Sequence, residues 1–289
     1  MYINSEQVTV KAFLLKFLKM REIGALIPLV VIFVIASFSN PAFTSLPNLL
    51  NMLRASAYIF IAAVGMTYVL CGRGLDLSIG SQVGMSGVVL GALMVWWNVP
   101  IVLAIFIALL VGALAGAING FFVVVLRVPP FIATLATFYG YRGILEGVTK
   151  GTPISPMPES FKIIGLGSLF GVAYVIWFMI FLFIVATFVL RKTKYGRYTL
   201  AMGGNPQSTR LAGISTKKLT FSLYVLMGVL ACIAGIFFTS RFSSALPTLG
   251  VGMELKVIAA CIIGGVSLFG GAGSILGTLI GSMFLVVLD

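Results

Sequence analysis

Residues 71–81 read CGRGLDLSIGS, and they interrupt a long apolar part of the chain. The flanking residues 55–70 and 83–97 are almost entirely apolar, whereas this stretch holds an arginine, an aspartate, two serines and three glycines. An ionised side chain at membrane depth is costly, so it usually faces a cavity or caps a helix. The stretch therefore predicts either a capped turn between two helices or a discontinuous helix that lines a translocation route.

The composition around this stretch indicates a multi-pass membrane protein. Hydrophobic residues make up 60% of the 289 residues and charged residues only 9%, against roughly 25% charged residues in typical soluble domains. Many apolar runs approach the roughly 20 residues that cross a hydrocarbon core of about 30 Å. The first run is not closed by a small-residue cleavage site, so we expect a retained span rather than a signal peptide.

We predict an all-α helix bundle, a single transmembrane domain over 1–289 with about nine spans. The eighth contains Gly264 and Gly265, which favours a broken or re-entrant helix, and the chain ends flush with an apolar run, which suggests a further span beyond Asp289. Glycines repeat every fourth residue in two spans, at 112–120 and 273–281, and predict close helix packing. The fifth span shows a similar small-residue face at Ala133, Thr137, Gly140 and Gly143. The nine segments are 24–39, 55–71, 79–96, 101–125, 130–148, 170–190, 219–239, 253–266 and 273–288.

The basic residues predict the orientation of the bundle. With the N-terminus inside, the inner segments carry 13 of the 19 basic residues, among them Lys11, Lys16, Lys19 and Arg21. Cytoplasmic loops are enriched in Lys and Arg, so this orientation is favoured. It places 191–218 in the cytoplasm, and it explains the net charge of +12 without nucleic acid.

Several kinds of chemistry are disfavoured by the residues present. There is no histidine, and Cys71, Cys232 and Cys261 lack metal-ligand spacing, so we expect no metal site and no disulfide. No lysine fits the G-x-x-x-x-G-K-[ST] spacing of a phosphate-binding loop. Convergent catalytic groups are also lacking, so we predict a transport subunit rather than an enzyme, with no catalytic residue and no cofactor in this chain.

The residues that carry transport are predicted from the polar positions in the spans. We assign Asp76, Ser78, Ser81 and Asn119 to the translocation pathway. Asp76 or Ser78 can also cap the following helix by accepting its first free backbone N–H groups. An ion-coupled secondary transporter is the alternative class, and Asp76 is its one candidate for an intramembrane coupling acid.

The chain resembles the ribose-type sugar permeases of bacterial ABC importers. The resemblance rests on GMTYVLCGRGLDLSIGS, on NGFFVVVLRVPPFIATLATFYGYRGI and on GRYTLAMGGNPQSTRLAGIS, and it extends from about Asn40 to the end. Arg73 and Pro206–Gln207–Ser208 depart from the family pattern. The resemblance implies about ten spans in the full protein and a bacterial cytoplasmic (inner) membrane location. It also implies a partner ATPase that binds ATP and Mg, a periplasmic or lipid-anchored sugar-binding protein, and a second permease copy or paralogue.

Two loops carry the predicted partner contacts. In the inner loop 191–218, Asn205 suits a helix N-cap and Gly213 a helix stop, so we expect a short helix at about 206–212. The resemblance implies that this helix couples to the ATPase, through Asn205, Gln207, Arg210, Leu211 and Gly213. In the outer loops near 149–169 and 240–252, we predict that Arg241, Ser243 and Ser244 contact the binding protein. The expected substrate is a pentose or hexose, with a furanone autoinducer, a nucleoside or a polyol as alternatives.

Overall fold

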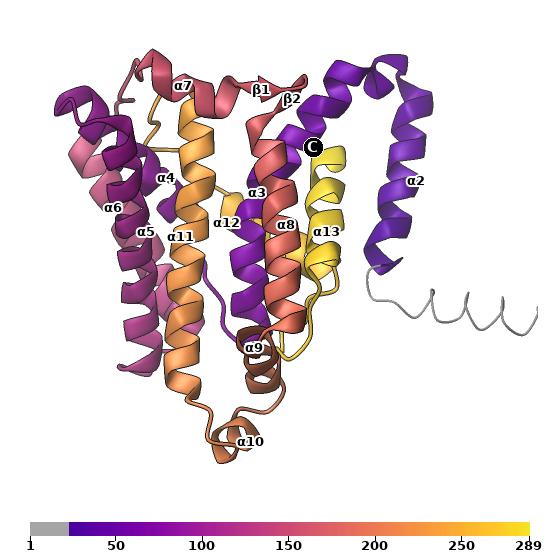
Figure 1. Ribbon diagram of the computed structural model, residues 1–289, viewed down its shortest axis with the longest axis vertical. Helices are drawn as coiled ribbons and strands as arrows, with labels where there is room; N and C mark the ends of the chain where they lie inside the picture. Colours follow the sequence, from indigo (N-terminus) through magenta and orange to yellow (C-terminus); the bar gives the residue numbers. More distant parts are fainter. Residues whose placement is uncertain (1–22) are drawn as a thin grey trace, which may run out of the picture.

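The computed structural model describes residues 23–289, and the basic residues Lys11, Lys16, Lys19 and Arg21 lie outside this part of the chain. The described residues form a helix bundle (Figure 1). Its helices are α2 (Ile23–Ser39), α3 (Leu46–Cys71), α4 (Ile79–Gly91), α5 (Ile101–Val124), α6 (Pro130–Thr149), α7 (Glu159–Leu166), α8 (Tyr174–Lys192), α9 (Lys194–Gly204), α10 (Pro206–Leu211), α11 (Thr216–Phe242), α12 (Met253–Ile263) and α13 (Ile275–Leu288). Two one-turn helices, η1 (Pro41–Thr44) and η2 (Ala92–Trp96), and a hairpin of β1 (Ser168–Leu169) and β2 (Val172–Ala173) complete it.

The all-α bundle predicted from the sequence is confirmed, and a helix occupies each predicted segment. Within residues 23–289, five helical segments are long and apolar enough to cross a membrane: Leu46–Cys71, Ile79–Trp96, Ile101–Val124, Tyr174–Lys192 and Thr216–Phe242. The eighth predicted segment holds only the 11 residues of α12. At about 1.5 Å per residue, α12 is far shorter than a hydrocarbon core of about 30 Å. A broken helix is expected there from Gly264 and Gly265, and α12 ends at Ile263, directly before them.

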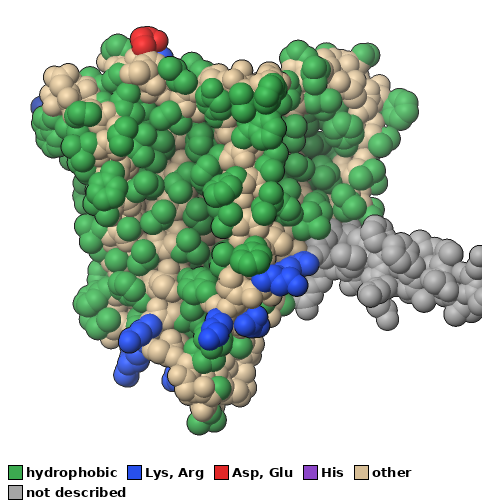
Figure 2. Space-filling view, in the orientation of Figure 1, with side chains coloured by type: hydrophobic (Ala, Val, Ile, Leu, Met, Phe, Trp, Pro, Cys, Tyr) green, Lys and Arg blue, Asp and Glu red, His purple; other side chains and the backbone are tan. Residues whose placement is uncertain are grey.

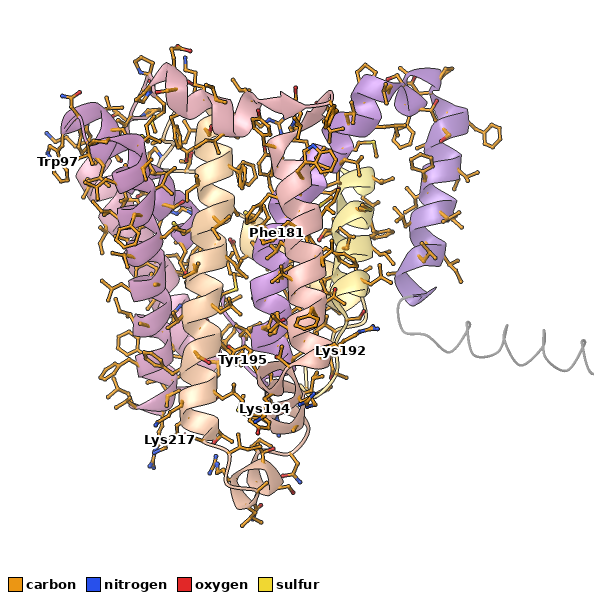
Figure 3. All side chains as sticks on the ribbon, in the orientation of Figure 1. Trp97, Phe181, Lys192, Lys194, Tyr195 and Lys217 are labelled. Atoms are coloured by element: carbon orange, nitrogen blue, oxygen red, sulfur yellow. The ribbon has the colours of Figure 1, made fainter. Side chains whose placement is uncertain are left out.

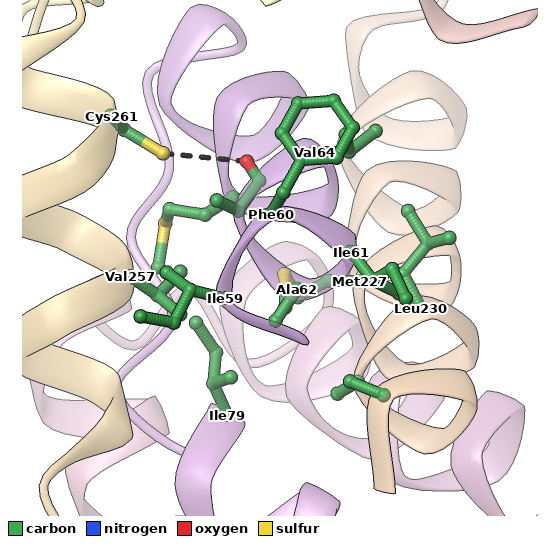
Figure 4. Packing of buried hydrophobic residues seen from close by; sticks show 14 of the residues in the cluster. Ile59, Phe60, Ile61, Ala62, Val64, Ile79, Met227, Leu230, Val257 and Cys261 are labelled. Atoms are coloured by element: carbon green, nitrogen blue, oxygen red, sulfur yellow. Dashed lines mark hydrogen bonds between the residues drawn. The ribbon is translucent and has the colours of Figure 1, made fainter. Parts of the chain in front are cut away.

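Helix α3 forms the centre of the bundle. Its residues from Ser56 to Cys71 are all buried, and they pack against α11, α12, α13 and α8. Figure 4 shows this packing around Phe60 and Val64, with Met227 and Leu230 of α11 on one side and Val257 and Cys261 of α12 on the other. The Cys261 thiol donates a hydrogen bond to the Ala63 carbonyl oxygen at 3.3 Å. Cys261 therefore fills space in an apolar contact between α3 and α12.

Close packing of α5 on α11 depends on small residues, as the glycine repeat predicted. A Cβ atom on Gly116 would overlap the backbone carbonyl group of Tyr224, and one on Gly228 would overlap that of Gly112. The two backbones are therefore in direct contact at these positions. Gly277 and Gly281 of α13 meet the backbone of α12 at Gly264 and Ala260 in the same way.

The small-residue face predicted for the fifth span is partly wrong. Ala133 and Thr137 are buried, but Gly140 and Gly143 are exposed and have no atom within reach of an added Cβ. The face of α6 that turns inward carries Arg142, whose guanidinium donates hydrogen bonds to the carbonyl oxygens of Pro247 and Leu249. A buried arginine needs several acceptors, and α6 turns Arg142 toward them, which leaves Gly140 and Gly143 off the packed face.

The bundle has two different ends, which we call the α10 end and the α7 end. The α10 end carries α9 and α10, and the α7 end carries α7 and the β1–β2 hairpin (Figure 1). Lys and Arg side chains gather at the α10 end in Figure 2, and Figure 3 places Lys192, Lys194 and Lys217 there, with Trp97 at the opposite end. Phe181, which is 59% exposed, projects from the apolar side surface. The surface thus matches a membrane-embedded bundle with one basic end.

The contact between α5 and α11 can be tested with one added methyl group. We expect Gly116→Ala to lower thermal stability, by about 1–3 kcal/mol, because the methyl group must push two helix backbones apart. The measurement is thermal unfolding of the detergent-solubilised protein, followed by circular dichroism. Gly143→Ala is the control, because it adds the same group to a helix where nothing lies within 4 Å. Equal stability of Gly116→Ala and wild type would contradict the packing described here.

Candidate functional site

The segment between α3 and α4 leaves the helix and runs back into the bundle as extended chain (Figure 1). Such a backbone is tolerated at membrane depth only where protein or water satisfies its polar groups. The Tyr224 hydroxyl of α11 donates to the Leu75 carbonyl oxygen at 3.2 Å, and the Leu77 N–H donates to Thr134 Oγ1 of α6 at 3.1 Å. At its start, the Gly271 N–H donates to the Cys71 carbonyl oxygen at 2.9 Å. Side chains and backbone of other elements therefore supply hydrogen bonds to the non-helical backbone of this segment.

The side chain of Asp76 is the centre of a buried polar cluster below α4. Its Oδ1 accepts hydrogen bonds from the backbone N–H and the hydroxyl of Ser78, at 2.8 and 2.6 Å. Its Oδ2 accepts from the amide groups of Asn119 and Gln82, at 3.1 and 3.3 Å. Both carboxyl oxygens thus act as acceptors, and four donors converge on them. Within residues 23–289, no lysine or arginine forms a salt bridge with Asp76.

The cluster joins three helices and the broken segment. Asn119 of α5 donates to Ser78 Oγ at 2.8 Å, and Gln82 of α4 donates to the same oxygen at 2.6 Å. Thr137 of α6 donates to Asn119 Oδ1 at 2.6 Å. Asp76, Ser78 and Asn119 are all 0% exposed. In this conformation the cluster is therefore closed to solvent and connects the helices. A role of these residues in the translocation pathway stays a prediction.

Three of the four predicted pathway residues thus come together: Asp76, Ser78 and Asn119. Ser81 does not join them, because its hydroxyl donates to the Phe138 carbonyl oxygen of α6 at 2.8 Å. The predicted helix cap is wrong. Ser78 occupies the N-cap position of α4 but makes no side-chain cap bond. The Ser78 hydroxyl donates to Asp76 instead. Asp76 accepts from the backbone N–H of Ser78, which precedes the first helical residue, so it does not cap the helix either.

Three further residues complete the cluster and were not predicted from the sequence as site residues: Gln82, Thr134 and Thr137. Gln82 lies one helical turn after Ser78, so the i, i+4 spacing could have placed it on the same face. Its Oε1 is buried and has no hydrogen-bond partner among residues 23–289. Thr134 and Thr137 carried no such signal, because threonines in apolar helices commonly bond to their own backbone.

At the α10 end, the short helix α10 presents the predicted coupling residues to solvent. Asn205 Oδ1 accepts from the Ser208 N–H at 3.0 Å, Pro206 follows at the first helical position, and Gly213 adopts a φ of 81°. Gln207 and Arg210 are exposed, and Leu211 is 84% exposed. A leucine so exposed on a helix of 6 residues leaves an apolar contact unfilled.

At the α7 end, the two predicted outer loops lie against each other. The backbones of Ile154 and Ala245 exchange hydrogen bonds of 3.1 and 2.9 Å. Of the predicted binding-protein contacts, Arg241 stacks over the ring of Tyr58, with its guanidinium carbon 5.5 Å from the ring centre. Ser243 and Ser244 are partly exposed beside it. A role of these three residues in partner binding stays a prediction.

Comparison with known proteins identifies the family. Residues 48–289 match the family of permease components of the branched-chain amino acid transport system. The chain belongs to this family. It is 42% identical to the ribose import permease protein RbsC of Haemophilus influenzae over 272 residues, which cover 93% of this chain and 84% of that protein. It is also similar to RbsC of Escherichia coli K12 (41%, with the same coverage).

A second kind of relative is the autoinducer 2 import system permease protein LsrC of Escherichia coli O9:H4. It is 37% identical over 278 residues, which cover 96% of this chain and 81% of that protein. No solved structure matches the chain. Together with the membrane-length apolar helices, these relatives identify the chain as a permease subunit of a bacterial ABC importer in the inner membrane.

The polar cluster predicts which change at Asp76 stops transport. We expect Asp76→Ala to reduce uptake at least tenfold, because four buried donors lose their acceptor, at about 1–3 kcal/mol each. Asp76→Asn should also impair uptake, since an amide offers only one acceptor oxygen to these donors. The measurement is uptake of labelled substrate at equal amounts of permease in the membrane. Ser86→Ala, a buried serine of α4 bonded to its own helix at Val83, is the control. Normal uptake with Asp76→Asn would contradict this prediction, because it would show that transport does not need both acceptor oxygens of Asp76.

Proposed function

We propose that the chain forms the translocation route of an importer for a pentose or hexose sugar. The observation that carries this is the 42% identity to a ribose import permease over 93% of the chain. The buried cluster around Asp76 adds a mechanical element. It fastens the broken segment to α4, α5 and α6, so a movement of these helices relative to α3 would have to rearrange it.

The proposed membrane arrangement has about nine spans with a cytoplasmic N-terminus. The basic α10 end would then face the cytoplasm, and the α7 end with loops 149–169 and 240–252 would face outward. The crowding of Lys and Arg side chains at the α10 end supports this orientation (Figure 2).

In this arrangement a partner subunit supplies the free energy for transport. We propose that ATP and Mg bind to an ABC ATPase, that the ATPase docks on α10, and that a sugar-binding protein delivers substrate at the α7 end. A second permease copy or paralogue would complete the route. The 84% exposure of Leu211 supports docking at α10, because a leucine side chain contributes about 1.5–3 kcal/mol when it is buried.

A second substrate class deserves a direct comparison, because the chain is 37% identical to an autoinducer 2 import permease. The decisive experiment reconstitutes the permease with its ATPase and binding protein in liposomes and measures uptake of ribose, other pentoses and hexoses, and a furanone autoinducer. Uptake of sugars alone supports the proposal, whereas uptake of the furanone alone overturns it.

The proposed orientation predicts the access of single cysteines. In cells without an outer membrane, an impermeant thiol reagent should label Ser155→Cys and spare Ser208→Cys, and it should label both after permeabilisation. Both positions are exposed, and the native Cys71, Cys232 and Cys261 are buried, so background labelling should be low. The reverse pattern would invert the topology.

The proposed docking at α10 predicts the effect of a charge at Leu211. We expect Leu211→Asp to insert normally but to lose at least tenfold of its ATPase binding, because a carboxylate would be buried without a partner. Co-purification of the ATPase and ATP turnover in liposomes measure this. Phe170→Asp is the control, since Phe170 is 89% exposed at the opposite end. Full ATPase binding by Leu211→Asp would place the coupling site elsewhere.

A further inference from the structure

A cavity of about 550 Å³ opens at the α10 end between the broken segment and α10. Its wall is built from the start of the segment after α3, the end of α5, the start of α6, helix α10 and the start of α11. Four cationic side chains line it, one or more from each of three separate parts of the chain: Arg73, Arg127, Arg210 and Lys217.

These four positive charges have no negative partner in the described part of the chain. No aspartate or glutamate lines the cavity, and the salt bridges among residues 23–289 involve only Lys162 and Lys256. Arg210 Nε donates to Thr216 Oγ1 at 3.0 Å, which leaves the rest of its guanidinium available. All four side chains are exposed. Like charges around one concavity repel each other, and a bound anion would relieve this repulsion.

The backbone at Arg73 is the second observation. Arg73 has a φ of 69°, a left-handed conformation that residues other than glycine rarely adopt. Its neighbours Gly72 and Gly74 leave no space for larger side chains, since a Cβ on Gly72 would overlap Leu223. An arginine held at a position that suits glycine is the kind of local strain that accompanies a binding role. Here the strain places a guanidinium on the inner wall of the cavity.

We propose that this cavity is a binding site for a small, soluble phosphate ester. A phosphate group carries a charge of about −1.5 to −2 near neutral pH, and the planar fork of arginine matches its oxygens. The volume lies within the roughly 300–1,000 Å³ that small-molecule sites occupy. The exposed Leu211 of α10 does not line the cavity, whereas Arg210 of the same helix does. A partner that docks through Leu211 would therefore border the site.

Occupation of this site would connect two parts of the molecule. A phosphate held between Arg73 and Arg210 or Lys217 would link the segment that carries Asp76 to the helix proposed to contact the ATPase. A cytoplasmic phosphate ester could thereby act on the coupling between them. The cytoplasmic location and the ATPase partner rest on the proposed function, whereas the cavity and its four cationic side chains do not.

The test measures binding of labelled glucose 6-phosphate by equilibrium dialysis to the permease–ATPase complex in nanodiscs of phosphatidylcholine. We expect saturable binding that inorganic phosphate competes for and that glucose does not. Arg73→Gly should weaken binding at least tenfold and leave the thermal stability unchanged or raised, because glycine adopts this φ without strain. This variant therefore separates a binding role from a folding role.

Two neighbouring lysines of α11 provide a matched pair. Lys217→Gln should weaken binding severalfold, whereas Lys218→Gln, which removes an exposed charge outside the cavity, should not. Hydrogen exchange should slow at 72–74 and 206–217 when the probe is bound. Absence of saturable binding, equal binding by Arg73→Gly, or equal losses in both lysine variants would overturn the proposal.

Two further outcomes would assign the cavity to another occupant. If binding appears with the permease alone and disappears when the ATPase is added, an acidic segment of the partner fills the cavity and the proposal is wrong. If phosphatidylglycerol in the nanodiscs abolishes binding, a lipid headgroup is the ligand and the proposal is wrong as well. Failure of sugar transport in liposomes would bear on the proposed function and not on this site.

Discussion

The carboxylate of Asp76 needs hydrogen-bond donors inside an apolar bundle, and much of the arrangement around it meets this need. Burying an unpartnered charge costs many kcal/mol, so the donors must be in place whenever the bundle is closed. They come from Ser78 beside it, from Gln82 of α4 and from Asn119 of α5, and Asn119 is itself held by Thr137 of α6. One acidic residue thereby fixes how three helices meet the end of α3.

Small residues supply the complementary constraint. Lipid-facing surfaces gain nothing from apolar burial, so close backbone contact must stabilise the helices against each other. Gly116 and Gly228 allow α5 and α11 to touch, and this contact sets the depth at which Asn119, one turn beyond Gly116, faces the broken segment. The polar cluster and the glycine contacts therefore depend on each other: a wider gap between α5 and α11 would move Asn119 away from Asp76.

The sequence was sufficient for the features that follow from local pattern. The apolar runs predicted the positions of the helices, and Asn205, Pro206 and Gly213 predicted α10, because capping and helix-stop preferences act over a few residues. Asp76 was found because it is the one acid in a long apolar stretch. The outer members of the cluster were harder to assign, since Thr134 meets Leu77 and Thr137 meets Asn119 only through the packing of α6 on α4 and α5. The face of α6 was misjudged for the same reason: the acceptors of Arg142 lie more than 100 residues away, at Pro247 and Leu249.

The segment 72–78 has different surroundings at its two ends, and this difference bears on mechanism. At Asp76 and Ser78 the segment is enclosed. In the described part of the surrounding cluster, Gln82 Oε1 is the buried side-chain atom without a hydrogen-bond partner. At Arg73 the segment is open to a basic cavity that also touches α10. The segment therefore connects the buried cluster, by covalent chain, to the wall of a cavity that α10 also lines.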